Sequence, residues 1–286
     1  MNISQKQFLP IKMTNMLKII ALLTMTIDHI AVALGHILPD TVVVFMRIIG
    51  RIAAPLFMYC LVNGIRYTSN RKKYFIRLYA ANLIIAFVWS PFSYTHSAPQ
   101  IIALYLYVFA YVILIEKIIC NIKEKKGLSA LKNSLIVVLI TILPVILDRT
   151  VCEYLCSVAF EMGGYELSSA LRTIFRAILP NIWTVDYTLL FVLMGVIWYF
   201  CKNKYIIGGI LVIFSAISYI GTYKLAASGF IDFFSANQYY MVLAAPIIML
   251  HNDKKQHKKS AFSKYFFYFY YPMHYMILTA ISNHIR

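Results

Sequence analysis

The sequence has few charged residues for its length. Only 13% of its 286 residues are Asp, Glu, Lys or Arg, while 61% are hydrophobic. A soluble globular protein carries about 25% charged residues, because such side chains cover its surface. The shortage excludes an ordinary soluble enzyme and predicts a chain that crosses a membrane several times.

Acidic residues are scarcer than basic ones. The sequence has 11 Asp and Glu against 27 Lys and Arg, which gives a formal net charge of +16. Such an excess is found in nucleic-acid-binding proteins, but in a membrane protein basic residues gather in cytoplasmic loops and orient the helices. We therefore expect a lipid bilayer, and no nucleic acid, as the partner of this charge.

Cysteine is also rare, with five residues, and none has a metal-ligand spacing. We therefore expect no metal cofactor. Cys152 and Cys156 lie four residues apart in a connection that we place outside the membrane, so they form either a disulfide or two free thiols. We favour free thiols, because nothing else in the sequence indicates a disulfide framework.

Long apolar runs are abundant. A helix of about 20 residues, rising 1.5 Å per residue, crosses the hydrocarbon core of a bilayer. The sequence has about nine candidate runs, at roughly 16–37, 42–65, 78–95, 99–119, 132–148, 183–201, 205–223, 238–251 and 262–283, of which 238–251 is shorter than a full crossing. We predict an all-α fold, a polytopic transmembrane helical bundle of about nine spans that forms one domain over residues 1–286.

The basic residues alternate between the two sides of this bundle. Of 27 Lys and Arg, 20 lie in the N-terminal stretch up to Lys18 or in the connections 66–77, 117–132, 202–204 and 252–264. Cytoplasmic loops carry such an excess, so we place the N-terminus in the cytoplasm and the C-terminus outside. The longest outer connection, 149–182, holds a Gly-Gly-Tyr-Glu turn at 163–166 and is expected to carry short helices.

Five acidic, basic or histidine residues lie well inside the predicted spans, away from the span ends. Ionisable groups at membrane depth are costly and tend to face the bundle interior or a water-filled cavity, so they are candidates for function. Three spans bring these groups to about the same depth, which a purely structural role does not require. The five residues are Asp28, His29, Arg47, Arg51 and His274.

Helix geometry separates the two neighbours Asp28 and His29. Consecutive helix residues point about 100° apart, whereas residues four apart, such as Arg47 and Arg51, share a face. We expect Asp28 to pair with Arg47 or Arg51, and His29 to face a cavity. The ion pair serves either to fix the helix register or to polarise a site.

The same residues suit two functions. In an acyltransferase, His29 is the general base, Arg51 faces the developing oxyanion, and His274 is a second acid–base group or positions the acceptor. In a proton-coupled transporter, they form a proton relay. The odd number of spans and the lack of internal symmetry count against a transporter, but these residues alone leave both functions open.

Basic residues around the second and third spans are candidates for binding the phosphates of a nucleotide-containing donor. Their alternative role is topological, through the positive-inside rule and attraction to anionic lipid. The candidates are Arg47, Arg66, Arg71, Lys72, Lys73 and Arg77.

Four stretches of the sequence resemble a known family. In order they are LKIIALLTMTIDHIAVAL (17–34), MRIIGRIAAPLFMYCLVNGIRYTSNRKKYFIRL (46–78), DYTLLFVLMGVIWY (186–199) and SKYFFYFYYPMHYMIL (263–278). They are similar to blocks of the TraX family, bacterial membrane proteins named for the pilin acetylase of conjugative plasmids. The resemblance implies an acetyl-CoA-dependent acetyltransferase of the bacterial plasma membrane.

The resemblance also implies an acceptor reached from outside: a peptide N-terminus, a pilin-like protein or a cell-surface glycan. Carried over by residue, it marks Asp28 and His29, Gly50 and Arg51, the basic loop Arg71–Arg77, Asp186 and Tyr187, and Tyr271, Pro272 and His274. It suggests that Asp186, Tyr187, Tyr271 and Asn63 bind substrate.

This sequence departs from the family pattern at three places. Asn63 stands where an acidic residue is expected, and HNDKK (251–255) replaces a polar Asn-Gly. The middle third, 100–182, matches weakly. These departures concern the acceptor more than the reaction. The sequence leaves the acceptor, the acyl chain and the oligomeric state open, a homo-oligomer included.

Overall fold

The structure is a computed structural model that describes residues 15–93, 100–185, 187–222, 237–251 and 261–285. Its regular structure is helical, with no strand among these residues, as predicted. Each of the nine apolar runs contains a helix, and five helical segments are long and apolar enough to cross a membrane. The number of spans and the orientation of the termini stay predictions.

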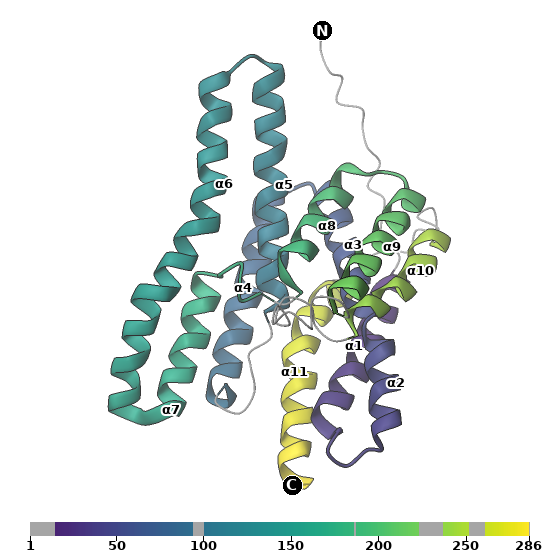
Figure 1. Cartoon of the computed structure of the whole chain (residues 1–286), viewed down its shortest axis with the longest axis vertical. Helices are drawn as coiled ribbons and strands as arrows, with labels where there is room; N and C mark the ends of the chain where they lie inside the picture. The colour runs from purple at the N-terminus through teal and green to yellow at the C-terminus, as the bar shows by residue number, and fades with distance from the viewer. Residues whose placement is uncertain (1–14, 94–99, 186, 223–236, 252–260, 286) are drawn as a thin grey trace. The chain divides into compact units, whose positions relative to one another are not determined.

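The chain forms two compact units (Figure 1). The first joins the two chain ends, Met1–Ser69 and Ile197–Arg286, and the second is the middle, Asn70–Val196. The first unit holds α1 (Asn15–Leu34), α2 (Asp40–Gly50), α3 (Ala53–Tyr67), α9 (Lys204–Ile220), η6 (Gln238–Leu243), α10 (Ala244–Leu250) and α11 (Ala261–Ile285). The second holds α4 (Arg71–Trp89), η1 (Ser90–Phe92), α5 (Ile101–Lys123), α6 (Gly127–Leu147), η2 (Asp148–Cys152) and α7 (Glu153–Ile178).

Helix α8 (Thr188–Phe200) crosses the boundary between the units at residue 196. The single domain expected over 1–286 stays a prediction.

Helices α1 and α11 lie side by side and run in the same direction (Figure 1). The Oγ1 of Thr26 lies 2.8 Å from the hydroxyl of Tyr270, and Ser282 Oγ donates to the Ala33 carbonyl at 2.7 Å. The residue numbers of the contacting partners therefore increase in the same direction along both helices, so the two helices are parallel. A parallel pair is what an odd number of crossings requires of the first and last spans.

The second predicted span is broken between α2 and α3. Pro55 has no N–H to donate to the carbonyl of Arg51, and a proline ring crowds the carbonyl four residues before it. Two i→i+3 bonds replace the helical pattern there, from Arg51 N to Ile48 O and from Ile52 N to Ile49 O, both 3.2 Å. Arg51 therefore lies where the α-helical hydrogen bonding gives way to a tighter, 3₁₀-like turn.

In the second unit, α7 is a helical hairpin. Gly163 and Gly164 leave the helical conformation, and Gly164 has φ +70°, which favours glycine. Nη1 of Arg172 lies 2.5 Å from Oε1 of Glu153, although 19 residues of straight helix would span about 28 Å. The turn therefore folds the second half of α7 back along the first, at the predicted Gly-Gly-Tyr-Glu position.

A buried carboxylate holds the hairpin base. Asp148, only 2% exposed, accepts from Arg176 Nε at 2.9 Å and Nη2 at 3.1 Å, and from Asn181 Nδ2 at 2.9 Å. Both of its oxygens therefore have partners. We call Asp148, Arg176 and Asn181 the hairpin cluster.

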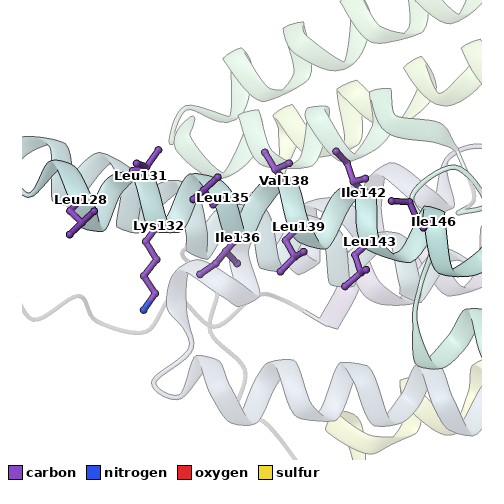
Figure 2. Close-up of a pocket in the computed structure, with 10 residues that line it drawn as sticks. All are labelled: Leu128, Leu131, Lys132, Leu135, Ile136, Val138, Leu139, Ile142, Leu143 and Ile146. Carbon is purple, nitrogen blue, oxygen red and sulfur yellow. The ribbon is translucent and has the colours of Figure 1, made fainter.

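Helix α6 carries a long apolar stripe with an open groove along it (Figure 2). Two or three side chains per turn contribute, and all but Lys132 are aliphatic. Such a surface is suited to lipid acyl chains. The lining residues are Leu128, Leu131, Lys132, Leu135, Ile136, Val138, Leu139, Ile142, Leu143 and Ile146.

Candidate functional site

The first unit gathers the five predicted intramembrane residues, which we call the polar cluster. Asp28 binds Arg47 from α2, and His29 binds His274 from α11. Arg51 is close enough to interact electrostatically with both Asp28 and His29. The prediction that Asp28 pairs with Arg47 or Arg51 is confirmed, and the prediction that His29 faces a cavity stays a prediction.

The ion pair of Asp28 is with Arg47. Nη1 of Arg47 lies 2.8 Å from Oδ2 of Asp28. A Cβ added to Gly50 would lie 2.3 Å from both the Cβ and the Oδ1 of Asp28, so glycine lets α2 approach α1 this closely. The sequence left the partner open between two arginines, and the structure selects the one nearer the outer end of the predicted span.

Arg51 is buried at the break between α2 and α3. It is 5% exposed, its Nε has no hydrogen bond, and no ion pair to it is found among the described residues. Oδ1 of Asp28 is likewise buried and unbonded. Leaving such groups unpaired costs free energy, so unsatisfied buried groups mark places where a ligand supplies the missing partner.

His29 and His274 form a direct hydrogen bond between α1 and α11. Nδ1 of His29 lies 2.6 Å from Nε2 of His274, with the ring planes 6° apart. Nδ1 of His274 lies 2.8 Å from the backbone carbonyl oxygen of Tyr270. His274 is 6% exposed, whereas His29 is half-buried. The two imidazoles are thus tied in one chain to the backbone of α11.

Tyrosines of α11 surround the two imidazoles. The ring centroids of Tyr271 and Tyr275 lie 6.2 Å and 4.9 Å from that of His29, both edge-on. Tyr270 lies parallel to His274 at 5.0 Å. The sequence reasoning missed Tyr270 and Tyr275, although the i,i+4 spacing of Tyr270 and His274 placed them on one helix face.

Arg66, a predicted phosphate ligand, has structural partners. Its Nη2 donates to the carbonyls of Trp198, Tyr199 and Cys201 at 2.7–3.0 Å, which are among the last carbonyls of α8 and the residue after it. Its Nη1 donates to Oδ1 of Asn63 at 2.9 Å. A cation at a helix C-terminus satisfies carbonyls that lack helical donors. Arg66 and Asn63 thus anchor α3 to the end of α8.

The basic residues of α4 differ in whether they contact other side chains. Arg71 pairs with Glu116 at 2.5 Å, and the guanidinium of Arg77 lies 5.9 Å from the ring centroid of Tyr74. Lys72 and Lys73 are exposed, with no ion pair to another described residue. These two lysines retain the free charge that a phosphate site needs.

The remaining predicted residues lie elsewhere. Tyr187 belongs to the second unit, has φ +63°, and its ring centroid lies 5.1 Å from that of Phe191. Asp186 lies outside the described residues.

Cys152 and Cys156 are free thiols whose sulfurs lie 3.9 Å apart. Among the described residues, no group of three or more potential metal ligands is found, and the absence of a metal stays a prediction.

A family model described as TraX protein matches residues 13–282, nearly the whole chain and the entire polar cluster. The chain belongs to the TraX family. No curated protein and no solved structure matches it. The match includes both units of this TraX protein, so membership extends over the weakly similar middle third as well.

Proposed function

We propose that this TraX protein is an acyltransferase of the bacterial plasma membrane. It would move an acetyl group from cytoplasmic acetyl-CoA to an amine or hydroxyl of an acceptor reached from the outer side. One observation carries the proposal: a half-buried imidazole lies in one cluster with a buried guanidinium whose Nε has no hydrogen-bond partner among the described residues. Acyl transfer needs such a pair, a proton acceptor and a cation for the oxygen that becomes negative.

His29 is the general base in this proposal. It takes the proton from the acceptor N–H or O–H while the acceptor atom bonds to the acetyl carbonyl carbon. The bond from that carbon to the donor sulfur then breaks, and His29 returns the proton to the departing thiolate. The net change is one acetylated acceptor and one free thiol, and His29 ends as it began.

Arg51 supplies the positive charge. Its guanidinium donates to the carbonyl oxygen as negative charge develops there, in a buried setting where a fixed donor is worth far more than in water. Asp28 and Arg47 hold α1 against α2 and so fix the distance between His29 and Arg51. The rings of Tyr271 and Tyr275 reduce the access of water to the imidazole pair.

Acetyl-CoA, when bound, supplies an acetyl group activated as a thioester. Among the basic residues predicted to hold its phosphates, we choose Lys72 and Lys73, because they are exposed, whereas Arg47, Arg66 and Arg71 already have partners and the Nε of Arg77 is buried. For the acceptor, Tyr271 is the predicted residue that contacts the imidazole pair. Asp186 and Tyr187 stay family-based proposals, and the bond from Arg66 favours a structural role for Asn63.

The test measures thiol release from acetyl-CoA by purified protein, with and without peptide or polysaccharide acceptors. His29→Ala should lower acceptor-dependent release by about 10²- to 10⁴-fold. His36→Ala is the matched control, because His36 is an exposed histidine just after the same helix, and it should leave release unchanged. Equal activity of His29→Ala and wild type would remove His29 from the chemistry.

A proton-coupled transporter is the second candidate, favoured by the hydrogen-bonded imidazole pair, which also suits a proton relay. Vesicles that contain the purified protein separate the two. Solute uptake driven by a proton gradient, together with no binding of acetyl-CoA, would replace our proposal with this one.

A further inference from the structure

We infer that His274 is a positioning residue that fixes the tautomer of His29, so that the Nε2 of His29 is the atom that accepts the acceptor's proton. This inference rests on the proposed function for its consequence in catalysis. Its structural part, the position of two protons, does not depend on any activity.

The direction of the hydrogen-bond chain follows from its last member. The carbonyl oxygen of Tyr270 can only accept, so Nδ1 of His274 must carry a hydrogen. In a neutral imidazole the other nitrogen then has a lone pair. Nε2 of His274 is therefore an acceptor in its contact with His29.

The second bond follows in the same way. Because Nε2 of His274 accepts, Nδ1 of His29 must donate across the 2.6 Å contact. The nearly parallel ring planes suit this bond, since the lone pair of an imidazole nitrogen lies in the plane of its ring. Nε2 of His29 is then left with a lone pair, and no hydrogen bond joins it to another described residue.

The neutral form of both imidazoles matches the charges around them. A further cation beside two arginines would be repelled at short range in a medium that screens poorly. The charged or titratable side chains near the imidazole pair are Arg47 from α2, Arg51 from the break, and Tyr270, Tyr271 and Tyr275 from α11. Asp28, which precedes His29 on α1, binds Arg47.

This arrangement gives the two histidines different roles. Both ring nitrogens of His274 are already used, one by Tyr270 and one by His29, so neither is left for a substrate. When Nε2 of His29 takes a proton, its Nδ1–H still donates to His274, and that bond becomes charge-assisted and stronger. His274 thus stabilises the protonated base without exchanging a proton with the acceptor.

Two amide variants separate this role from the alternatives. In His274→Gln the side-chain oxygen reaches the position of Nε2 and can accept from His29. In His274→Asn the shorter amide lies near the position of Nδ1 and contacts only its own helix. The measurement is the turnover number, the KM for acetyl-CoA and the pH profile of thiol release, in detergent-purified protein of verified folding.

We expect His274→Gln to keep turnover within about tenfold of wild type with an unchanged pH profile, and His274→Asn to lose about 100-fold, with KM for acetyl-CoA unchanged in both. If His274 itself exchanged protons with the substrate, both variants would lose turnover equally and one limb of the pH profile would disappear. If it only filled space, both would match wild type. Either result overturns the inference.

A second measurement needs no activity. Nitrogen-15 NMR of histidine-labelled wild-type protein reports which ring nitrogen carries the proton, with His29→Gln and His274→Gln used to assign the signals. Both histidines should carry it on Nδ1. A proton on Nε2 of His29 would overturn the inference even if the enzyme were active. Inactive wild-type protein with both protons on Nδ1 would contradict only the proposed function.

Discussion

The hairpin cluster and the polar cluster bury charge in opposite ways. In the second unit, both oxygens of Asp148 are bonded, to Arg176 and Asn181. In the first unit, Asp28 bonds Arg47 through one oxygen while its other oxygen and the Nε of Arg51 stay buried without partners. The hairpin cluster is complete without a ligand, and the polar cluster is not.

This difference separates scaffold from candidate chemistry. A buried ion pair with every group bonded rigidifies a fold, and removal of one partner leaves a costly lone charge. An unpaired buried cation costs stability in the free protein and is retained where it meets a ligand or a transition state. Substitutions in the two clusters should therefore affect different observables.

The largest expected effect is on stability, in the hairpin cluster. Arg176→Leu removes the cation that pairs with the nearly inaccessible Asp148, so the free energy of unfolding should fall by about 3–5 kcal/mol. Thermal unfolding in detergent measures it. A loss below about 1 kcal/mol would show that the bidentate pair is not what holds the hairpin.

The next effect is on turnover, in the polar cluster. Arg51→Leu removes the oxyanion partner, so turnover should fall about 10²- to 10³-fold. Because this change also removes an unpaired buried charge, thermal stability should stay equal or rise. Arg47→Leu is the contrasting variant, since it strands Asp28 and should lower stability. If Arg51→Leu destabilised the protein as much as Arg176→Leu does, the proposed difference between the polar cluster and the hairpin cluster would be contradicted.

A third effect concerns the contact of α1 with α2. Gly50→Ala puts a methyl group where Asp28 already lies, and should destabilise by about 1–3 kcal/mol while disturbing the pair with Arg47. Gly209→Ala in α9 is the control, because a Cβ there meets no atom within 4 Å. That change should be neutral or stabilise by up to about 1 kcal/mol. Equal effects at both glycines would contradict the close approach.

The smallest effect is on donor binding. Replacement of Lys72 and Lys73 by Gln should raise the KM for acetyl-CoA several-fold and weaken its dependence on salt, because exposed charges near phosphates act through screened attraction. Lys123 and Lys125, exposed at the end of α5 and just after it, are the control pair. An identical change in the control would assign the effect to net charge rather than to a phosphate site.

Much of this arrangement was predictable from single residues. Helical periods and apolar run lengths predicted the helices, and the cost of charge in lipid selected the five residues of the polar cluster. The 100° step between Asp28 and His29 predicted that they face different partners. The glycine pair at 163–164 predicted the turn of the hairpin.

The rest depends on tertiary contacts that no local pattern encodes. Arg47 and Arg51 share a helix face, so only the close approach at Gly50 and the break before Pro55 decide which one pairs with Asp28. The bond between His29 and His274 joins residues 245 positions apart. Arg66 was predicted to bind phosphate because nothing near it in the sequence shows that it contacts the end of α8, more than 130 residues away.

The most direct test of the account measures acetyl-CoA turnover per folded molecule in wild type, Arg51→Leu and Arg176→Leu. We predict that Arg176→Leu unfolds at lower temperature but turns over at the wild-type rate while folded. Arg51→Leu should show the opposite, with wild-type stability and turnover lowered at least about 100-fold. Wild-type turnover in folded Arg51→Leu would contradict the claim that the unpaired cluster carries the chemistry.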